Sequence, residues 1–169
     1  MKSIHYLFSI TMIYLLMTSC STVEQKNIDI INDPFLQSQQ EIKEAVEGIA
    51  RDAQSANLEG LTSIHLNSKK FTKFGPRNFE RQDVNSTNET ESAHFGSVEN
   101  LTMEIKDLKV DVFGDIGIAT YYPHVTFTRD GEQTKASARQ TLVFLNTDDG
   151  WKIIHEHGTM KPVKEVASD

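Results

Sequence analysis

The sequence contains one cysteine, Cys20, in 169 residues, together with four prolines and one tryptophan. A single cysteine cannot form an internal disulfide, so the folded part of the chain has no covalent cross-link and no thiolate ligands. Basic residues are also scarce: 17 Lys and Arg stand against 24 Asp and Glu, which gives a net charge of -7. An acidic surface repels phosphate groups, and no Lys/Arg cluster is interleaved with aromatic residues. We therefore expect no nucleic-acid partner.

Long apolar runs are missing except near the N-terminus, where Tyr6–Met17 is nearly unbroken. This run has the length of a signal-peptide core and is shorter than the roughly 20 residues of a membrane-spanning helix. The segment Leu16-Met17-Thr18-Ser19-Cys20 follows and resembles the bacterial lipobox. The resemblance implies that residues 1–19 are a lipoprotein signal peptide and that Cys20 carries the lipid chains, palmitate among them. The alternative is an ordinary secretory signal with an incidental cysteine.

This interpretation predicts a location and a domain layout. Residues 20–32 would be the lipidated N-terminus and a polar tether, 33–162 one folded domain, and 163–169 a disordered tail. We expect lipid anchoring in the bacterial cell envelope. Ser21 after the cysteine suits the outer membrane, with the domain facing the periplasm or the cell surface.

Residues 33–95 show the patterns of helices. Asp33-Pro34 suits a helix start, because aspartate caps the first turn and proline fits inside it. Apolar residues then recur at helical spacing, at Ile42, Val46, Ile49 and Ala53. The other expected elements are a short helix at Leu58–Leu66, a short strand at Phe71–Phe74, and a helix at Thr87–Phe95 opened by a Ser86–Glu89 capping box.

From Asn100 onward the pattern is one of alternation. The expected strands are Leu101–Val112, Ile116–Thr128, Thr134–Asn146 and Trp151–Met160. The alternation changes phase at Lys106-Asp107, which indicates a β-bulge, and Pro123 argues for an edge strand or a second bend. Helices followed by long antiparallel strands predict an α+β domain with its helices on one face of a curved sheet.

Several segments resemble the SnoaL-like proteins of the nuclear transport factor 2-like superfamily. These segments are Gly114–Ala119, Arg139–Phe144, Asp149–His157 and Phe71–Pro76. The resemblance implies a cone-shaped roll: helices packed in a strongly curved antiparallel sheet, with a pocket at the open end and dimerisation through the sheet. The superfamily includes isomerases, dehydratases and cyclases as well as members without chemistry, so the fold alone does not give a function.

The candidate pocket residues are Tyr121, Gln140, His155 and His157. Alternation along the last strand places Trp151, Ile153, His155 and His157 on one face, and we expect this more apolar face to turn inward. Tyr122, His124 and Arg139 also lie in the middle of strands, but alternation sends half of these polar residues outside. His155 and His157 with His124 or Asp111 could in principle hold a metal ion. Packed, hydrogen-bonded histidines are the simpler interpretation, so we predict no metal and no cofactor.

Three functions fit the sequence. The favoured one is an envelope-anchored domain that binds a small apolar or amphipathic ligand, or a protein partner, in or through its cone. The alternative is a cofactor-independent isomerase, dehydratase or cyclase that uses general acid–base catalysis. A catalyst would need a buried carboxylate beside a phenol or imidazole, and Asp107 and Asp111 are the nearest acids to the predicted pocket. The third is a structural accessory protein of the envelope. The sequence leaves open whether the protein is an enzyme.

Overall fold

The computed structural model describes residues 28–76 and 78–161. Its elements, in chain order, are α2 (Leu36–Gln54), α3 (Leu58–Ser63), β1 (Thr72–Phe74), α4 (Val84–Phe95), β2 (Glu99–Phe113), β3 (Ile116–Arg129), β4 (Glu132–Thr147) and β5 (Gly150–Met160). The predicted signal peptide, Cys20 and the C-terminal tail lie outside the described residues. Within those residues no helix combines the length and the apolar character needed to cross a membrane.

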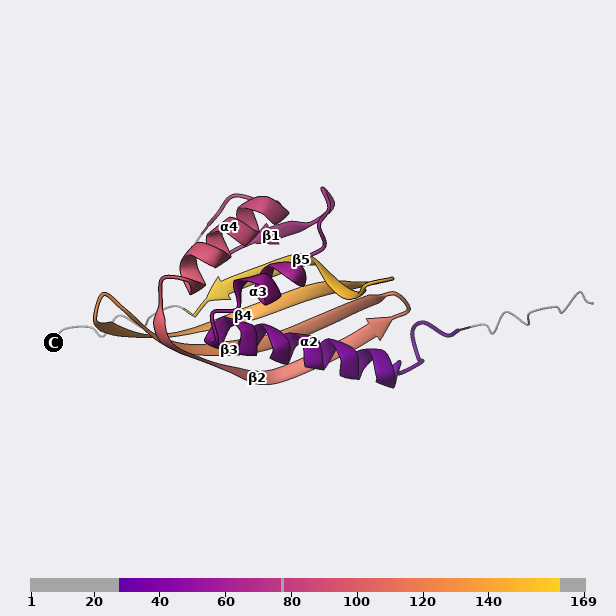
Figure 1. The fold of residues 1–169 in the computed structure, drawn as a ribbon. Coiled ribbons are helices and arrows are strands. Elements are labelled where there is room, and N and C mark those ends of the chain that lie inside the picture. The colour runs from indigo at the N-terminus through magenta and orange to yellow at the C-terminus, as the bar shows by residue number, and fades with distance from the viewer. Residues whose placement is uncertain (1–27, 77, 162–169) are drawn as a thin grey trace, which may run out of the picture.

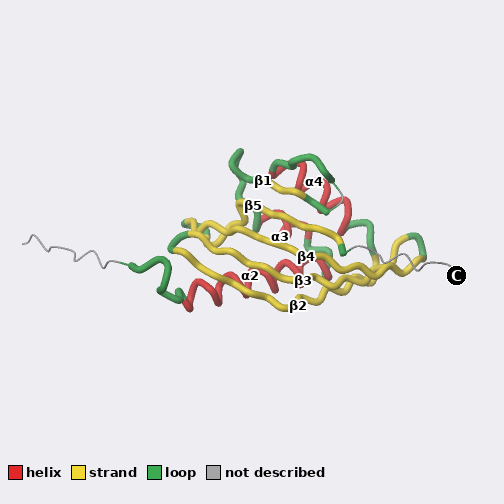
Figure 2. The backbone as a smooth tube through the Cα atoms, turned by 180° about the vertical axis from the view of Figure 1, so that it is seen from behind, coloured by secondary structure: helices red, strands yellow, loops and turns green. Residues whose placement is uncertain are grey.

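The five strands form one sheet in the order β1-β5-β4-β3-β2. Strand β1 pairs with β5 in parallel, and the other pairs are antiparallel, so the sheet is mixed rather than purely antiparallel as expected. Figure 1 shows α2 and α3 lying along one face of the curved sheet and α4 beside β1. From behind, Figure 2 shows the strands in front, with no described helix over that outer face. This is the predicted α+β cone, open on one side.

The core lies between α2 and the inner face of the sheet. Helix α2 buries Ile42, Val46, Ala50 and Ala53, which confirms most of its predicted apolar stripe. A Cβ atom at Gly117 would lie 2.2 Å from Ile42 Cδ1, so the glycine lets the helix approach β3 closely. The buried residues of both core clusters lie between Ile42 and Ile153. The chain from Ser21 onward therefore contains every described element and every residue of the described core.

Helix starts differ from the expected positions by a few residues. Asp33 Oδ1 accepts a hydrogen bond from Phe35 N at 2.9 Å, but α2 begins at Leu36, after Phe35 in the left-handed conformation. Helix α4 begins at Val84 because Asp83 caps it, with its carboxylate accepting from Ser86 N at 2.9 Å. The predicted Ser86–Glu89 capping box is therefore wrong: Ser86 is the partner of the cap rather than the cap itself.

The bends in the long strands decide which side chains face the helices. The register of β2 against β3 shifts between Lys106 and Lys109, and Asp107 has a φ of 51°, which confirms the predicted bulge. Pro123 lies in β3, and β3 lies between β2 and β4 in the sheet. The prediction that this proline marks an edge strand is therefore wrong.

Candidate functional site

A cavity of about 510 Å³ lies between the helices and the inner face of the sheet. Most of its wall is apolar. The apolar side chains that line it are Ile49, Leu61, Ile64, Phe95, Met103, Pro123, Val125, Phe127, Ala136, Ala138, Leu142 and Met160. Its volume falls within the roughly 300–1,000 Å³ that small-molecule sites occupy. The polar part of the wall gathers four charged side chains, which belong to four different segments of the chain.

The first of these is His65, which follows α3 and is 5% exposed. Two backbone hydrogen bonds fix this segment to β5: Leu66 N donates to Ile153 O, and Ile153 N donates to Ile64 O, both at 2.9 Å. The His65 ring is held at both nitrogens. Nε2 lies 2.8 Å from Glu156 Oε1, and Nδ1 lies 2.8 Å from the amide oxygen of Asn88.

Lys73 and Glu156 are neighbours in the parallel pair of β1 and β5. Both are buried, and Lys73 Nζ lies 2.8 Å from Glu156 Oε2. Glu156 thus gives one carboxylate oxygen to His65 and the other to Lys73. A buried carboxylate requires such partners, because an unpaired charge in an apolar interior is very costly.

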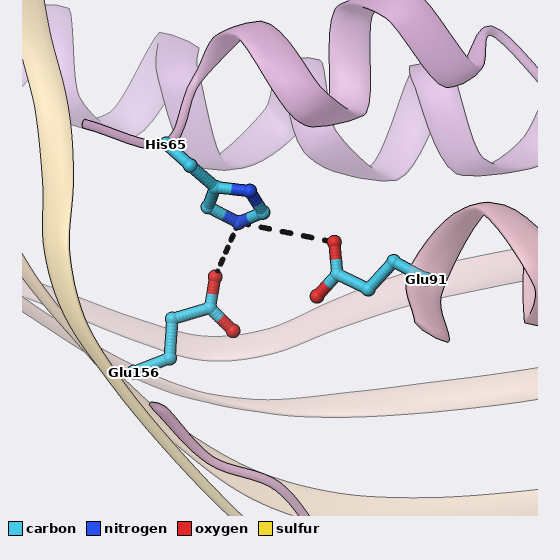
Figure 3. A group of neighbouring side chains, drawn as sticks. All are labelled: His65, Glu91 and Glu156. Atoms are coloured by element: carbon cyan, nitrogen blue, oxygen red, sulfur yellow. Dashed lines mark hydrogen bonds and ion pairs between the residues drawn. The ribbon is translucent and has the colours of Figure 1, made fainter. Parts of the chain in front are cut away.

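Glu91 completes the group from α4. One of its carboxylate oxygens pairs with Lys73 Nζ, and the other lies 3.8 Å from His65 Nε2. Figure 3 shows the carboxylates of Glu91 and Glu156 pointing at the same ring nitrogen of His65. We call His65, Lys73, Glu91 and Glu156 the charged quartet.

The quartet sets the protonation of its members. Burial would raise the pKa of Glu156, but Lys73 and His65 outweigh it and lower this pKa to about 2. Burial would lower the pKa of His65, yet the nearby Glu156 and Glu91 carboxylates raise it. Lys73 likewise keeps a raised pKa against its burial because of the same two carboxylates. For Glu91, burial and the neighbouring Glu156 raise the pKa above its usual value.

This arrangement favours the protonated ring of His65. Glu156 and Glu91 raise its pKa, and both ring nitrogens lie 2.8 Å from oxygen atoms that accept hydrogen bonds. The ligand atoms of His65, Glu91 and Glu156 lie within 4.8 Å of one another, close enough to consider a metal ion. The ammonium group of Lys73 contacts both carboxylates and already supplies the cation there. These residues therefore suit an internal cation better than an added metal.

Two predicted pocket residues line the cavity. Tyr121 on β3 and Gln140 on β4 are cross-strand partners, and both face inward. Burial raises the pKa of the Tyr121 hydroxyl, with Glu156 and Glu91 adding to the effect. A Cβ at Gly158 would lie 2.5 Å from Gln140 Oε1, so this glycine makes room for the Gln140 side chain.

The inward orientation predicted for His155 and His157 is wrong. In the pairing of β4 with β5, Val143 faces His155 while the next residue, Phe144, faces Ile153, so Ile154 is an extra residue in β5. This bulge exchanges the faces of the strand and turns Glu156 inward. His155 is bonded to Thr72 Oγ1 through Nδ1 at 2.8 Å, and His157 is exposed in an outer groove of about 300 Å³.

The other polar candidates also lie away from the cavity. Tyr122 and His124 are exposed on β3, and Arg139 is exposed on β4. Asp107 is exposed, and Asp111 pairs with Lys109 on the surface. The buried acids of the cavity are thus Glu156 and Glu91, which sequence reasoning missed along with His65 and Lys73. The sequence offered one indication of this site: Glu156 lies between His155 and His157, in a segment that resembles the SnoaL-like proteins.

Comparisons with known proteins agree with the fold. Residues 42–161 match the family model of the SnoaL-like domain, and the chain belongs to this family. A nuclear transport factor 2-like superfamily protein from Salmonella enterica has a TM-score of 0.69 at 18% identity, covering 79% of this chain and 98% of that one. No curated protein matches the chain significantly.

Two further solved structures carry names that suggest enzymes. A proposed dehydratase of the nuclear transport factor 2-like family from Streptomyces avermitilis has a TM-score of 0.68 at 17% identity, covering 75% of this chain and 98% of its own. A proposed aromatic ring hydroxylase from Novosphingobium aromaticivorans has a TM-score of 0.66 at 12% identity, covering 76% and 92%. At these identities the likeness establishes the fold and not the activity.

Proposed function

We propose that this SnoaL-like protein is anchored in the bacterial envelope and binds a small apolar or amphipathic molecule in its cavity. The observation that carries the proposal is the cavity of about 510 Å³, with largely apolar walls and a polar side formed by buried groups. Apolar walls supply affinity by removing the ligand's surface from water, and a few fixed polar groups orient it.

Tyr121 and Gln140 are suited to that orienting role. Both line the cavity, and among the described residues neither side chain has a hydrogen-bond partner in the protein. A ligand that offers an oxygen could accept a hydrogen bond from the Tyr121 hydroxyl in the cavity wall. The charged quartet beside it is held by its own ion pairs, which keeps this side of the cavity rigid.

A cavity-filling variant tests the proposal. N-phenyl-1-naphthylamine is a neutral probe whose fluorescence rises in apolar surroundings. It would be titrated into the chain from Ser21 onward and into its Ala138→Trp variant, since Ala138 lines the cavity. Arg139→Trp is the matched control, because the next residue is exposed. We expect Ala138→Trp to weaken binding by at least about tenfold, or 1.4 kcal/mol, with the control unchanged. Equal binding by all three proteins would contradict the proposal.

A second candidate function is acid–base catalysis without a cofactor, of the isomerase, dehydratase or cyclase kind. Glu91 favours it, because its carboxylate lies in the cavity wall, with the side chain only 17% exposed, and has a raised pKa. A carboxylate of this kind can accept a proton from a bound substrate while the Tyr121 hydroxyl donates a hydrogen bond to a carbonyl oxygen. Among the solved structures of similar fold, the proposed dehydratase is consistent with such chemistry.

Glu91→Gln separates the two candidates. If the protein is an enzyme, this variant loses turnover of any substrate found by screening carbonyl and hydroxy compounds, and it keeps its affinity for the neutral probe. If Glu91 is only part of a binding site, turnover by the wild type will be absent in the same screen. Unchanged turnover in Glu91→Gln would contradict a catalytic role for this residue.

The proposed anchor rests on the lipobox-like end of the N-terminal apolar run. Mass spectrometry of the membrane-extracted protein should find acyl chains on Cys20, and Cys20→Ala should release the protein from the membrane. A soluble mature form with an unmodified Cys20 would contradict the proposed anchor.

We also propose that the protein forms a homodimer through the outer face of the sheet. It should appear in light scattering of the chain from Ser21 onward, and a monomer at high micromolar concentration would contradict it.

A further inference from the structure

The charges in the cavity wall cancel one another. The ion pairs of the charged quartet join two basic side chains, Lys73 and His65, to two carboxylates, Glu91 and Glu156, so the paired charges are equal in number. Each charge contacts at least one of opposite sign: Lys73 contacts both carboxylates, and Glu156 contacts both cations. No member is left over to pair with a charge on a ligand.

Two other ionisable side chains line the described wall, His94 and Tyr121. His94 Nδ1 lies 2.9 Å from a guanidinium nitrogen of Arg129, and because a guanidinium can only donate, the ring nitrogen accepts this hydrogen bond. Tyr121 has a raised pKa and keeps its proton. The acidic side chains of the described wall are therefore those of the quartet, where each carboxylate has a cationic partner.

The polar groups that remain available are uncharged. The Gln82 amide also lines the cavity but donates to Thr90 Oγ1 at 3.0 Å, so it is already engaged. Tyr121, Gln140 and Ser137 also line the cavity and are left to meet a ligand. A phenol hydroxyl donates to a carbonyl or hydroxyl oxygen, and a primary amide or a serine hydroxyl can both donate and accept. These groups match a neutral oxygen function.

We propose that the cavity selects uncharged amphipathic molecules that carry a carbonyl or hydroxyl group near Tyr121, and that the balanced quartet excludes ionised ligands. This inference rests on the proposed ligand-binding function. A carboxylate, sulfonate or ammonium group entering the cavity would lose its hydration, and the described residues of the wall offer it no counter-ion outside the paired quartet. The cost of burying such an unpaired charge exceeds what the apolar walls return.

A matched pair of probes tests the selectivity. N-phenyl-1-naphthylamine is neutral, and 1-anilinonaphthalene-8-sulfonate has the same rings with one added sulfonate. Both would be titrated into the chain from Ser21 onward at neutral pH, with Ala138→Trp to identify binding inside the cavity. We expect the neutral probe to bind at least about tenfold more tightly than the sulfonate, since a buried unpaired charge costs several kcal/mol.

Removing the negative charge of Glu91 should weaken the preference of the cavity for the neutral probe over the sulfonate. Glu91→Gln keeps the shape of the side chain and leaves the quartet with one surplus positive charge. The ratio of the affinity for the sulfonate to the affinity for the neutral probe should then rise several-fold above its wild-type value. Glu104→Gln on the exposed side of β2 is the matched control and should leave both affinities unchanged.

The outcomes are distinct. If the wild-type cavity binds the sulfonate as tightly as the neutral probe, or if Glu91→Gln leaves the ratio of the two affinities unchanged, the inference of charge selectivity is overturned while ligand binding stands. If neither probe binds, or if Ala138→Trp binds both as the wild type does, the proposed function fails together with the inference.

Discussion

His65 and Glu156 lie 91 residues apart in the sequence, yet His65 Nε2 is 2.8 Å from Glu156 Oε1 inside the protein. This contact joins the segment after α3 to the last strand. The second oxygen of Glu156 extends it to Lys73 on β1. Glu156 thus connects three segments of the chain at the polar side of the cavity. The stability of the domain should therefore depend on its contacts with His65 and Lys73.

Replacing Glu156 should strongly destabilise the fold. Glu156→Gln removes the charge of the carboxylate that lies 2.8 Å from both Lys73 Nζ and His65 Nε2. Breaking a buried ion pair in this way costs about 3–5 kcal/mol. The free energy of unfolding, measured by urea titration, should fall by this amount. The control Glu104→Gln, on an exposed carboxylate, should change it by less than about 0.5 kcal/mol. Equal effects would show that the quartet adds no stability.

The contribution of His65 should depend on pH. Its pKa is raised in the folded state, so the stabilisation is fully present below the unfolded value of 6.5 and is lost as pH rises through the folded pKa. The difference in melting temperature between the wild type and His65→Gln should therefore shrink as pH rises above 6.5. His157→Gln is the control, because His157 is exposed. A difference that is constant or grows with pH contradicts a protonated His65.

Tyr121 should recognise a carbonyl oxygen. Prodan, a neutral naphthalene probe with a propionyl carbonyl, should bind more weakly to Tyr121→Phe by about 0.5–1.5 kcal/mol, the usual net value of one hydrogen bond. N-phenyl-1-naphthylamine has no carbonyl and should bind both proteins equally. Fluorescence titration measures both affinities. An equal loss for the two probes would mean that the substitution disturbs the cavity rather than removing a hydrogen bond.

The outward histidines should not affect ligand binding. His157→Ala should leave the affinity for both neutral probes unchanged, since His157 lies on the outer face of the sheet. His155→Ala removes the hydrogen bond with Thr72 and should cost about 1 kcal/mol of stability, again without altering binding. Calorimetry and probe titration give the two quantities. A loss of binding in either variant would place the ligand outside the cavity.

The two bulges show what the sequence could and could not predict. At Lys106-Asp107 polar residues interrupt an apolar alternation, so the change of phase was visible. At Ile154 the extra residue is itself apolar and follows Ile153, so alternation continues across it in either phase. The face of the last strand was therefore predicted wrongly, and Glu156 was assigned to the outside.

The rest of the charged quartet had no local signal. His65 follows a helix of six residues, and Glu91 lies in α4, whose sequence has a weak apolar pattern. The quartet is assembled by contacts between segments far apart in the chain. His65 is placed by its bridge to Ile153 on β5, and Lys73 by its pairing with Glu156. The fold class, by contrast, followed from strand alternation and turn residues, which are local features.

The cavity itself is tested most directly by a crystal structure of the chain from Ser21 onward with prodan bound. We expect the naphthalene ring against Leu142 and Phe127, with the carbonyl oxygen of prodan within hydrogen-bonding distance of the Tyr121 hydroxyl. The smaller outer groove, which contains Arg139 and His157, offers the competing position. Prodan bound in that groove, with the inner cavity unchanged, would contradict ligand binding in the inner cavity.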